Sequence, residues 1–270
     1  YKASDEEVDF VIAVSYSGET AETLRSLSSF VHSGATFVVV TSGGRLARIA
    51  EKLGAPLIRI RPGLPPRFAF PDMLGAVLGI LEPLGLDIKR IISEAEDARA
   101  FQESIKEGVR IEDNPAKKAA EAVVGRIPII YAYEEVRSVG YRLKCQLNEN
   151  SKLFCHYAEI PEAFHNDVEG FPENFILLLP RSSKEPEPIK MGLQVLCEKI
   201  GTDKCISLRA SSSKPFQELF ELFMLVDYLS VYAAILAGSN PLTLNIIPDM
   251  RRKNRANMKI LTEIDREFRI

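Results

Sequence analysis

The sequence has almost no excess charge of either sign. Its 34 Lys and Arg residues are balanced by 37 Asp and Glu residues, which gives a formal net charge of −3. Without a basic surplus, the chain has no general electrostatic attraction to a polyanion, so nucleic acid is not an expected partner. Any anionic ligand must instead be held by a local arrangement of donors.

Long apolar runs are also missing. No run reaches the roughly 18 residues expected of a membrane span, and the first residues lack the basic and apolar regions of a signal peptide. We therefore expect a cytosolic protein with no membrane partner. The first residue is Tyr1 rather than methionine, so we also expect that a segment upstream is missing.

Cysteine is scarce and shows no metal-binding spacing. Cys145, Cys155, Cys197 and Cys205 form no CxxC pair, so we expect buried thiols rather than a zinc site. A disulfide between Cys197 and Cys205 is expected only if the source is a hyperthermophile with an oxidising interior.

Short apolar runs alternate with longer helical patterns from residue 9 onward. The strands "DFVIAVSY", "ATFVVVTS" and "APLIRI" are followed by helices from Glu19, Gly44 and about Arg67. A second series has "IPIIYAYEE", a helix over about 136–148, a short strand near "KLFCHY", "NFILLLP", a helix from about Glu185, and "DKCISLRA". Nearly continuous apolar strands separated by amphipathic helices predict an α/β fold of parallel sheets covered on both faces.

The predicted boundary between the two series lies at "EDNPA", where a charged helical stretch ends. This gives a first domain over 1–112 and a second over 113–270. Helices over about 214–236 and from about Asp249 to the end complete the second domain. The basic run "RRKNRANMK" on the last helix is interpreted as a solvated face.

The stretch "VSYSGETAETL" gathers hydroxyls at a turn between a strand and a helix. Ser15, Ser17 and Thr20 surround Gly18 at the start of the helix, where backbone N–H groups and the helix dipole favour an anion such as phosphate. A plain helix cap is the alternative, in which Ser17 or Thr20 satisfies the first turn and Glu22 completes a capping box.

Together with "VVTSGGRLARIAEKLG", where Ser42 to Gly44 form the next turn, this pattern resembles the sugar isomerase (SIS) domain, which binds phosphosugars. The later stretch "YRLKCQLNENSKLFCHYAEIPEAFHNDVEG" resembles the archaeal-type bifunctional phosphoglucose/phosphomannose isomerases. That resemblance spans about residues 9–253 and implies two tandem SIS domains.

The resemblance implies three catalytic residues for an aldose–ketose isomerisation. Glu149 of "NEN" would be the base that carries the proton, His165 of "HN" would open the sugar ring, and Arg67 would steady the enediolate. Each has a structural alternative: a helix-end carboxylate, a histidine on a turn, and an arginine in a proline-rich turn. His32 and His156 match no motif and are interpreted as structural.

The carboxyl-terminal part departs from the family pattern. Thr243 is the candidate for the residue that biases hexose selection, although it lies one residue closer to the Asn-Pro pair than expected. The lysine of the family falls on Arg252 or Lys253. At the amino end, the strand and the G-x-G-G-S-G turn of the family are missing, and we expect the first domain to be shortened there.

The expected activity is interconversion of fructose 6-phosphate with glucose 6-phosphate and mannose 6-phosphate, without a cofactor or a metal, by a homodimer in which His165 serves either its own or the partner's site. A phosphosugar-sensing module without turnover is one alternative, and it would have no use for Glu149. Another SIS enzyme, such as an amidotransferase's isomerase half or a ketopentose-phosphate isomerase, is the second.

Overall fold

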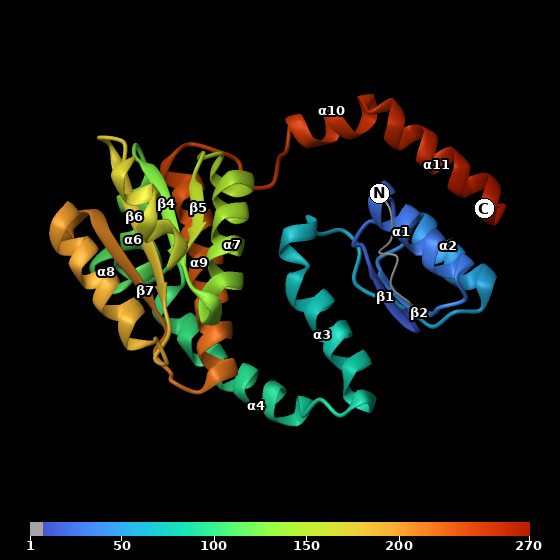
Figure 1. Ribbon diagram of the computed structural model, residues 1–270, viewed down its shortest axis with the longest axis horizontal. Coiled ribbons are helices and arrows are strands. Elements are labelled where there is room, and N and C mark those ends of the chain that lie inside the picture. The colour runs from blue at the N-terminus through green and yellow to red at the C-terminus, as the bar shows by residue number, and fades with distance from the viewer. Residues whose placement is uncertain (1–7) are drawn as a thin grey trace. The chain divides into compact units, whose positions relative to one another are not determined.

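The computed structural model describes residues 8–270, which form two compact units (Figure 1). Unit 1 combines the chain up to Ile88 with Leu244–Ile270, and unit 2 is Lys89–Thr243. Both sheets are parallel throughout and flanked by helices, so the predicted α/β fold is confirmed. The expectation about the amino end concerns residues 1–7 and what precedes them, outside the described part of the chain.

Unit 1 is built on a sheet of order β1-β2-β3. The central strand is buried almost throughout because both of its neighbours are parallel and helices cover its faces. Its elements are β1 (Phe10–Val14), α1 (Ala21–His32), β2 (Thr36–Thr41), α2 (Gly44–Leu53), β3 (Leu57–Arg59), the short 3-10 helix η1 (Pro66–Phe68), α3 (Phe70–Leu81), η2 (Glu82–Leu84), α10 (Ile246–Lys253) and α11 (Arg255–Phe268).

The last helix, α11, completes the core of unit 1. Ile264 and Phe268 are buried in one cluster with Leu24, Leu27 and Ile49 from α1 and α2. Figure 1 shows α11 lying along α1 and α2. A polar contact also joins α1 to α11: Ser28 Oγ donates a hydrogen bond to a carboxylate oxygen of Glu267 at 2.6 Å.

Unit 2 is built on a sheet of order β5-β4-β6-β7. Figure 1 shows α8 on the opposite side of this sheet from α7. Its elements are α4 (Ile88–Ala98), η3 (Arg99–Phe101), α5 (Gln102–Ile105), η4 (Ile111–Asp113), α6 (Pro115–Val123), β4 (Ile127–Ala132), η5 (Glu134–Val136), α7 (Arg137–Gln146), the π-helical turn η6 (Leu147–Ser151), β5 (His156–Glu159), η7 (Glu162–His165), η8 (Asp167–Glu169), β6 (Phe175–Arg181), α8 (Glu187–Ile200), η9 (Thr202–Lys204), β7 (Cys205–Arg209) and α9 (Pro215–Leu236).

Helix α9 is the central helix of unit 2 and packs against α6 and α7. By length and composition alone it could cross a membrane, which the sequence pattern did not indicate because Glu218, Glu221 and Asp227 interrupt its apolar run. Both glutamates are buried, and Glu221 accepts a hydrogen bond from the Ser211 amide at 2.6 Å. Its buried residues belong to the core of unit 2, which accounts for the apolar composition.

The two units differ from the predicted halves at both of their limits. The segment 89–112 lies in unit 2 because Glu94 accepts hydrogen bonds from Phe216 N and Gln217 N at the start of α9, at 2.8 and 3.3 Å. The break at "EDNPA" therefore marks the start of α6 inside this unit. The carboxyl-terminal segment lies in unit 1, and its predicted single helix is divided at Asn254 into α10 and α11.

Candidate functional site

The serine loop, residues 15–20, follows β1 and leads into α1 at the carboxyl edge of the sheet. Ser15 is buried, and its hydroxyl lies 3.0 Å from the Thr20 hydroxyl. Thr20 occupies the cap position of α1 with an extended backbone but makes no side-chain capping hydrogen bond. Ser17 Oγ accepts from the Glu19 amide at 3.2 Å, just before the helix. Neither hydroxyl therefore caps α1, and the alternative of a plain helix cap is not what the structure shows.

A second turn, residues 41–45 after β2, interlocks with the serine loop. Gly18 adopts a φ of 66°, and a Cβ atom placed there would lie 1.9 Å from the Gly43 carbonyl oxygen. The Leu46 amide donates to Gly18 O at 3.1 Å, and the Ser42 amide donates to Tyr16 O at 2.9 Å. The two turns thus form one rigid rim, and glycine at position 18 is required by both conformation and space.

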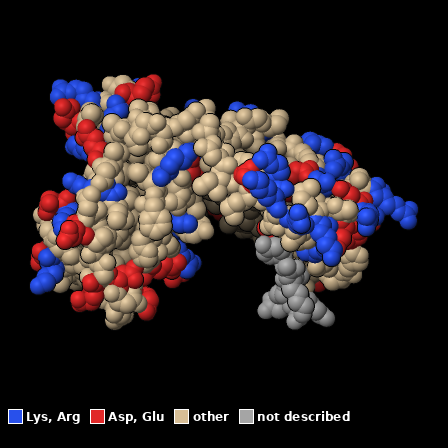
Figure 2. Space-filling view, turned by 90° about the horizontal axis from the view of Figure 1, so that it is seen from above, with Lys and Arg blue, Asp and Glu red and all other residues tan. Residues whose placement is uncertain are grey.

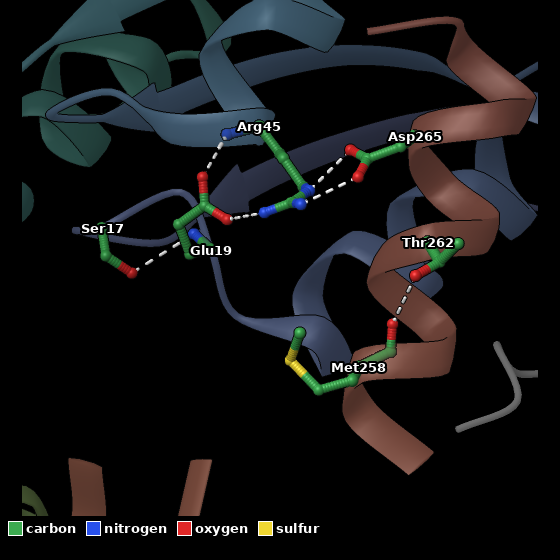
Figure 3. A network of polar contacts seen from close by, with 6 residues as sticks. All are labelled: Ser17, Glu19, Arg45, Met258, Thr262 and Asp265. Atoms are coloured by element: carbon green, nitrogen blue, oxygen red, sulfur yellow. Dashed lines mark hydrogen bonds and ion pairs between the residues drawn. The ribbon is translucent and has the colours of Figure 1, made fainter. Parts of the chain in front are cut away.

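Arg45 joins this rim to the last helix (Figure 3). Its backbone amide donates to Glu19 Oε1 at 2.9 Å and its guanidinium pairs with the same carboxylate. On the other side the guanidinium donates to both oxygens of Asp265 on α11, at 2.6 and 2.8 Å. The hydrogen bonds that Arg45 donates to Asp265, reinforced by Glu19, raise the pKa of Arg45, and Arg45 in turn lowers the pKa of the Asp265 carboxyl. Arg45 and Asp265 are therefore held in their charged forms.

A cavity of about 350 Å³ opens beside the serine loop, between the start of α1 and the helices α10 and α11. Ser17, Thr20 and Glu22 line it from the start of α1, and Arg251 and Arg252 line it from α10. Figure 2 looks onto α10 and α11, where basic and acidic side chains are interspersed. Arg252 and Lys253 both pair with Asp249, but Arg251 makes no ion pair within residues 8–270.

This cavity suits a phosphate group. The hydroxyls and the amino end of α1 supply donors, and Arg251 supplies a positive charge that makes no ion pair with a described carboxylate, although Glu22 also lines the cavity. The family resemblance named Arg252 and Lys253 as the candidates, of which Arg252 lines the cavity and Lys253 does not. Arg251 was missed because spacing alone cannot say which side of a short helix faces the loop.

Arg67 lies in η1, at the same carboxyl edge of the unit 1 sheet. Its guanidinium carbon lies 5.0 Å from the centre of the Phe68 ring. The hydroxyl of Tyr16, in the serine loop, accepts from the Leu64 amide at 2.7 Å and donates to Arg61 O at 3.1 Å. This hydroxyl fixes the loop that leads to Arg67 against the serine loop.

Glu149 lies in the π-helical turn η6, where α7 ends. The turn is fastened to α9: Asn150 Nδ2 donates to Ser230 Oγ at 2.9 Å, and Ser151 Oγ donates to Ser230 O at 2.7 Å. Glu149 itself is half-buried. These contacts hold the backbone that bears Glu149.

His165 closes η7 and lies at the opposite edge of the unit 2 sheet from Glu149. Helix α7 runs back from the carboxyl end of β4, so η6 lies at the amino edge, whereas η7 follows the carboxyl end of β5. The ten residues of α7 separate these edges by about 15 Å. His165 is exposed and, within residues 8–270, makes no hydrogen bond or ion pair.

The remaining histidines and cysteines have structural partners or surroundings. His156 Nε2 lies 2.6 Å from Asp167 Oδ2, and His32 Nδ1 lies 2.8 Å from Ser28 O. Burial raises the pKa of the Cys155 thiol to about 12. The four thiols are free, one of them buried and three half-buried, and no group of three or more potential metal ligands converges within residues 8–270.

Comparisons with known proteins bear on both units. Residues 112–253 match the family model of the bacterial phospho-glucose isomerase C-terminal SIS domain. A bifunctional phosphoglucose/phosphomannose isomerase of Aquifex aeolicus is 30% identical over 251 residues, covering 90% of this chain and 75% of that protein. A D-glucosamine-6-phosphate 4-epimerase of Sulfolobus acidocaldarius is 32% identical over 170 residues, 63% of this chain and 53% of that protein.

Among solved structures, a hypothetical protein from Thermus thermophilus aligns with a TM-score of 0.70 at 19% identity, covering 93% of this chain and 71% of that one. At this identity the match concerns the fold. It extends the likeness over both units of the chain.

Proposed function

Since this chain belongs to the bifunctional phosphoglucose/phosphomannose isomerase family, we propose that it interconverts fructose 6-phosphate with glucose 6-phosphate and with mannose 6-phosphate. The resemblance found in the sequence is confirmed, and an isomerase is supported over a sensing module. The observation that carries the proposal is the cavity in which Ser17 and Thr20 face Arg251. It supplies what a sugar phosphate needs: hydroxyl donors, a helix amino end and the guanidinium of Arg251, which makes no ion pair within residues 8–270.

We assign the phosphate to Ser15, Ser17 and Thr20, with Arg251 and Arg252 on the facing wall of the cavity. Ser15 takes part through its hydrogen bond with the Thr20 hydroxyl, which does not cap α1 and can bond to the phosphate as well as to Ser15. The phosphate would hold the sugar while the chemistry takes place at C1 and C2, so this group contributes binding rather than proton transfer.

We assign the proton transfers to Glu149 and His165. His165 opens the ring by moving a proton to and from the ring oxygen, a task for which an exposed imidazole without competing partners among residues 8–270 is suited. Glu149 then carries the proton between C1 and C2 through a cis-enediol, and Arg67 stabilises the charge that develops on the enediolate oxygens. Positioned acid and base groups of this kind contribute about 100- to 10,000-fold each to a rate.

We further propose that the active form is a homodimer in which His165 serves the site of the partner subunit. Glu149 and His165 lie at opposite edges of one sheet, separated by about the length of α7, roughly 15 Å. Acid–base groups must come within hydrogen-bond reach of one sugar, and their places at opposite edges of the sheet favour two different chains as the source of the two groups. A two-fold dimer whose interface pairs the carboxyl edge of one copy with the amino edge of the other would bring both groups to one sugar. The protein would act in the cytoplasm, in glycolysis and gluconeogenesis.

The isomerase proposal is tested in heavy water with fructose 6-phosphate as substrate. Deuterium at C2 of glucose 6-phosphate and mannose 6-phosphate, lost in Glu149→Gln, is the expected result because the base exchanges its proton with solvent during transfer. A Glu149→Gln protein that keeps wild-type turnover would contradict the base assignment, and a folded wild type without any exchange would contradict the activity.

The shared site is tested by mixing two inactive variants. Glu149→Gln and His165→Ala chains, unfolded together in equal amounts and refolded, should recover about one quarter of wild-type activity, since half of the dimers are mixed and each retains one intact site of two. Each variant refolded alone is the control. Absence of recovery, with mixed dimers present by native mass spectrometry, would show that both groups act within one chain.

A further inference from the structure

Lys152 joins the turn that bears Glu149 to the loop that bears Thr243. Its ammonium group donates to the backbone carbonyls of Glu149 and Asn150, the latter at 3.3 Å, and to the carbonyl of Asn240 at 3.0 Å. An ammonium group has three N–H donors, enough to reach each of these carbonyls. The first two are carbonyls at the end of a helix, which have no partner inside the helix itself.

The backbone of Lys152 indicates that its side chain is needed. The residue has φ 59° and ψ 21°, the left-handed conformation that ends many helices and that glycine adopts most readily. Within residues 8–270, Arg269 is the one other residue besides glycines with a positive φ. A lysine in this conformation bears a backbone strain that a glycine would avoid. What it adds is a cation folded back onto the negative end of the α7–η6 helix.

The Asn240 carbonyl completes the connection. It accepts from Lys152 Nζ and also from the Thr243 hydroxyl, at 3.3 Å. The same asparagine organises its loop through its side chain, whose oxygen accepts from the Leu242 amide at 2.9 Å. One carbonyl oxygen therefore lies between the turn of the proposed base and the residue that the sequence resemblance associates with hexose selection.

We propose that Lys152 is a positioning residue that fixes Glu149 relative to the sugar and couples that position to the Thr243 loop. The proposal rests on the proposed function, because it requires Glu149 to be the base. Loss of the ammonium group would free both the turn and the loop, while the phosphate cavity lined by Ser17 and Arg251 in unit 1 would keep its contacts. The consequence would be slower proton transfer and a changed ratio of glucose 6-phosphate to mannose 6-phosphate, with little change in substrate affinity.

The test compares Lys152→Met, Lys152→Gly and Lys152→Arg with a matched control, Lys190→Met. Lys190 is a lysine of the same unit, on α8, where it pairs with Glu187 at 3.4 Å. We measure kcat and KM for fructose 6-phosphate, the ratio of the two aldose products, and the thermal midpoint of each protein. Wild type and Glu149→Gln are assayed alongside.

We expect kcat of Lys152→Met to fall by about 10- to 100-fold with KM within about twofold, because a shift near 1 Å in a reacting group has effects of that size. The product ratio should change in the same variant, and Lys152→Arg should restore part of kcat. Lys152→Gly separates an effect on stability from an effect on catalysis. Glycine relieves the backbone strain, so the thermal midpoint of this variant should equal or exceed that of Lys152→Met while its kcat remains low.

Two results would overturn the inference. If kcat and the product ratio of Lys152→Met equal those of Lys190→Met while wild type is active and Glu149→Gln is not, Lys152 does not position the base and the proposed function stands. If wild type itself shows no turnover, or Glu149→Gln is fully active, the proposed function fails and the inference fails with it.

Discussion

Replacing Gly18 with alanine tests whether the interlocked turns hold the proposed phosphate site. Gly18 has φ 66°, and a Cβ there would lie 1.9 Å from the Gly43 carbonyl oxygen, whereas real Cβ contacts are essentially never under 3.0 Å. The two turns must therefore separate by about 1 Å, a displacement that can lower a rate by about 100-fold when it affects substrate positioning.

Gly34 provides the matched control. It also has a positive φ, 84°, but a Cβ at that position would meet nothing within 4 Å. Both substitutions bear the cost of placing alanine in a left-handed conformation, about 1–2 kcal/mol. Gly18→Ala should cost about 2 kcal/mol more, because the hydrogen bonds Leu46 N to Gly18 O and Ser42 N to Tyr16 O are strained or lost, at about 1 kcal/mol each.

The assay is urea unfolding of both variants, together with kcat and KM for fructose 6-phosphate and the affinity for inorganic phosphate. We expect Gly34→Ala to keep the wild-type KM. Gly18→Ala should raise both KM and the dissociation constant for phosphate at least about tenfold, because the displaced serine loop no longer positions its donors around the phosphate. Equal stability and equal KM for the two variants would refute the reasoning, since the close approach to Gly43 would then have no energetic consequence.

Two further predictions concern the charges around the same cavity. Because Arg45 lowers the pKa of the Asp265 carboxyl, the pair stabilises the fold above the ordinary aspartate pKa and loses that effect as pH falls through the lowered value. The difference in unfolding free energy between wild type and Asp265→Asn, measured by urea unfolding from about pH 7 to about pH 2, should therefore be largest near neutrality and vanish in acid. A difference that does not change with pH would contradict this prediction. Arg251→Met should raise KM for fructose 6-phosphate about tenfold and weaken its dependence on ionic strength, whereas Lys253→Met, which removes a charge outside the cavity, should leave KM near wild type; equal effects of the two would show a diffuse basic field in place of a defined contact.

The sheets and the serine loop could be predicted from the sequence because their signals are local. Continuous apolar runs such as "TFVVVT" define buried parallel strands, and hydroxyls around one glycine define the turn after β1. The division of the chain could not be predicted in this way. It depends on contacts between distant positions, such as Glu94 with the amides that begin α9, and a break in helical periodicity cannot distinguish a domain boundary from a turn within a domain.

The candidate site shows the same contrast. Sequence motifs named Ser17, Thr20 and Glu149, whereas Arg251 and Lys152 emerge only once the helix ends are placed in space. Nothing in the sequence pointed to Lys152, because a lysine after a helix is ordinarily solvated and the amino-acid sequence does not show that its φ is positive. The catalytic roles of Glu149 and His165 stay predictions that the variants above address, and the role of Arg67 stays a prediction.

The pairing of Arg45 with Asp265 has a consequence for how the protein is made. Arg45 leaves the ribosome 220 residues before its partner, so at synthesis rates of about 5–20 residues per second roughly 10–45 s pass before the serine loop can be braced. All of unit 2 is synthesised in that interval. A nascent chain therefore holds a complete unit 2 while unit 1 still awaits α11, so the serine loop gains its contact with Asp265 only after unit 2 has been made.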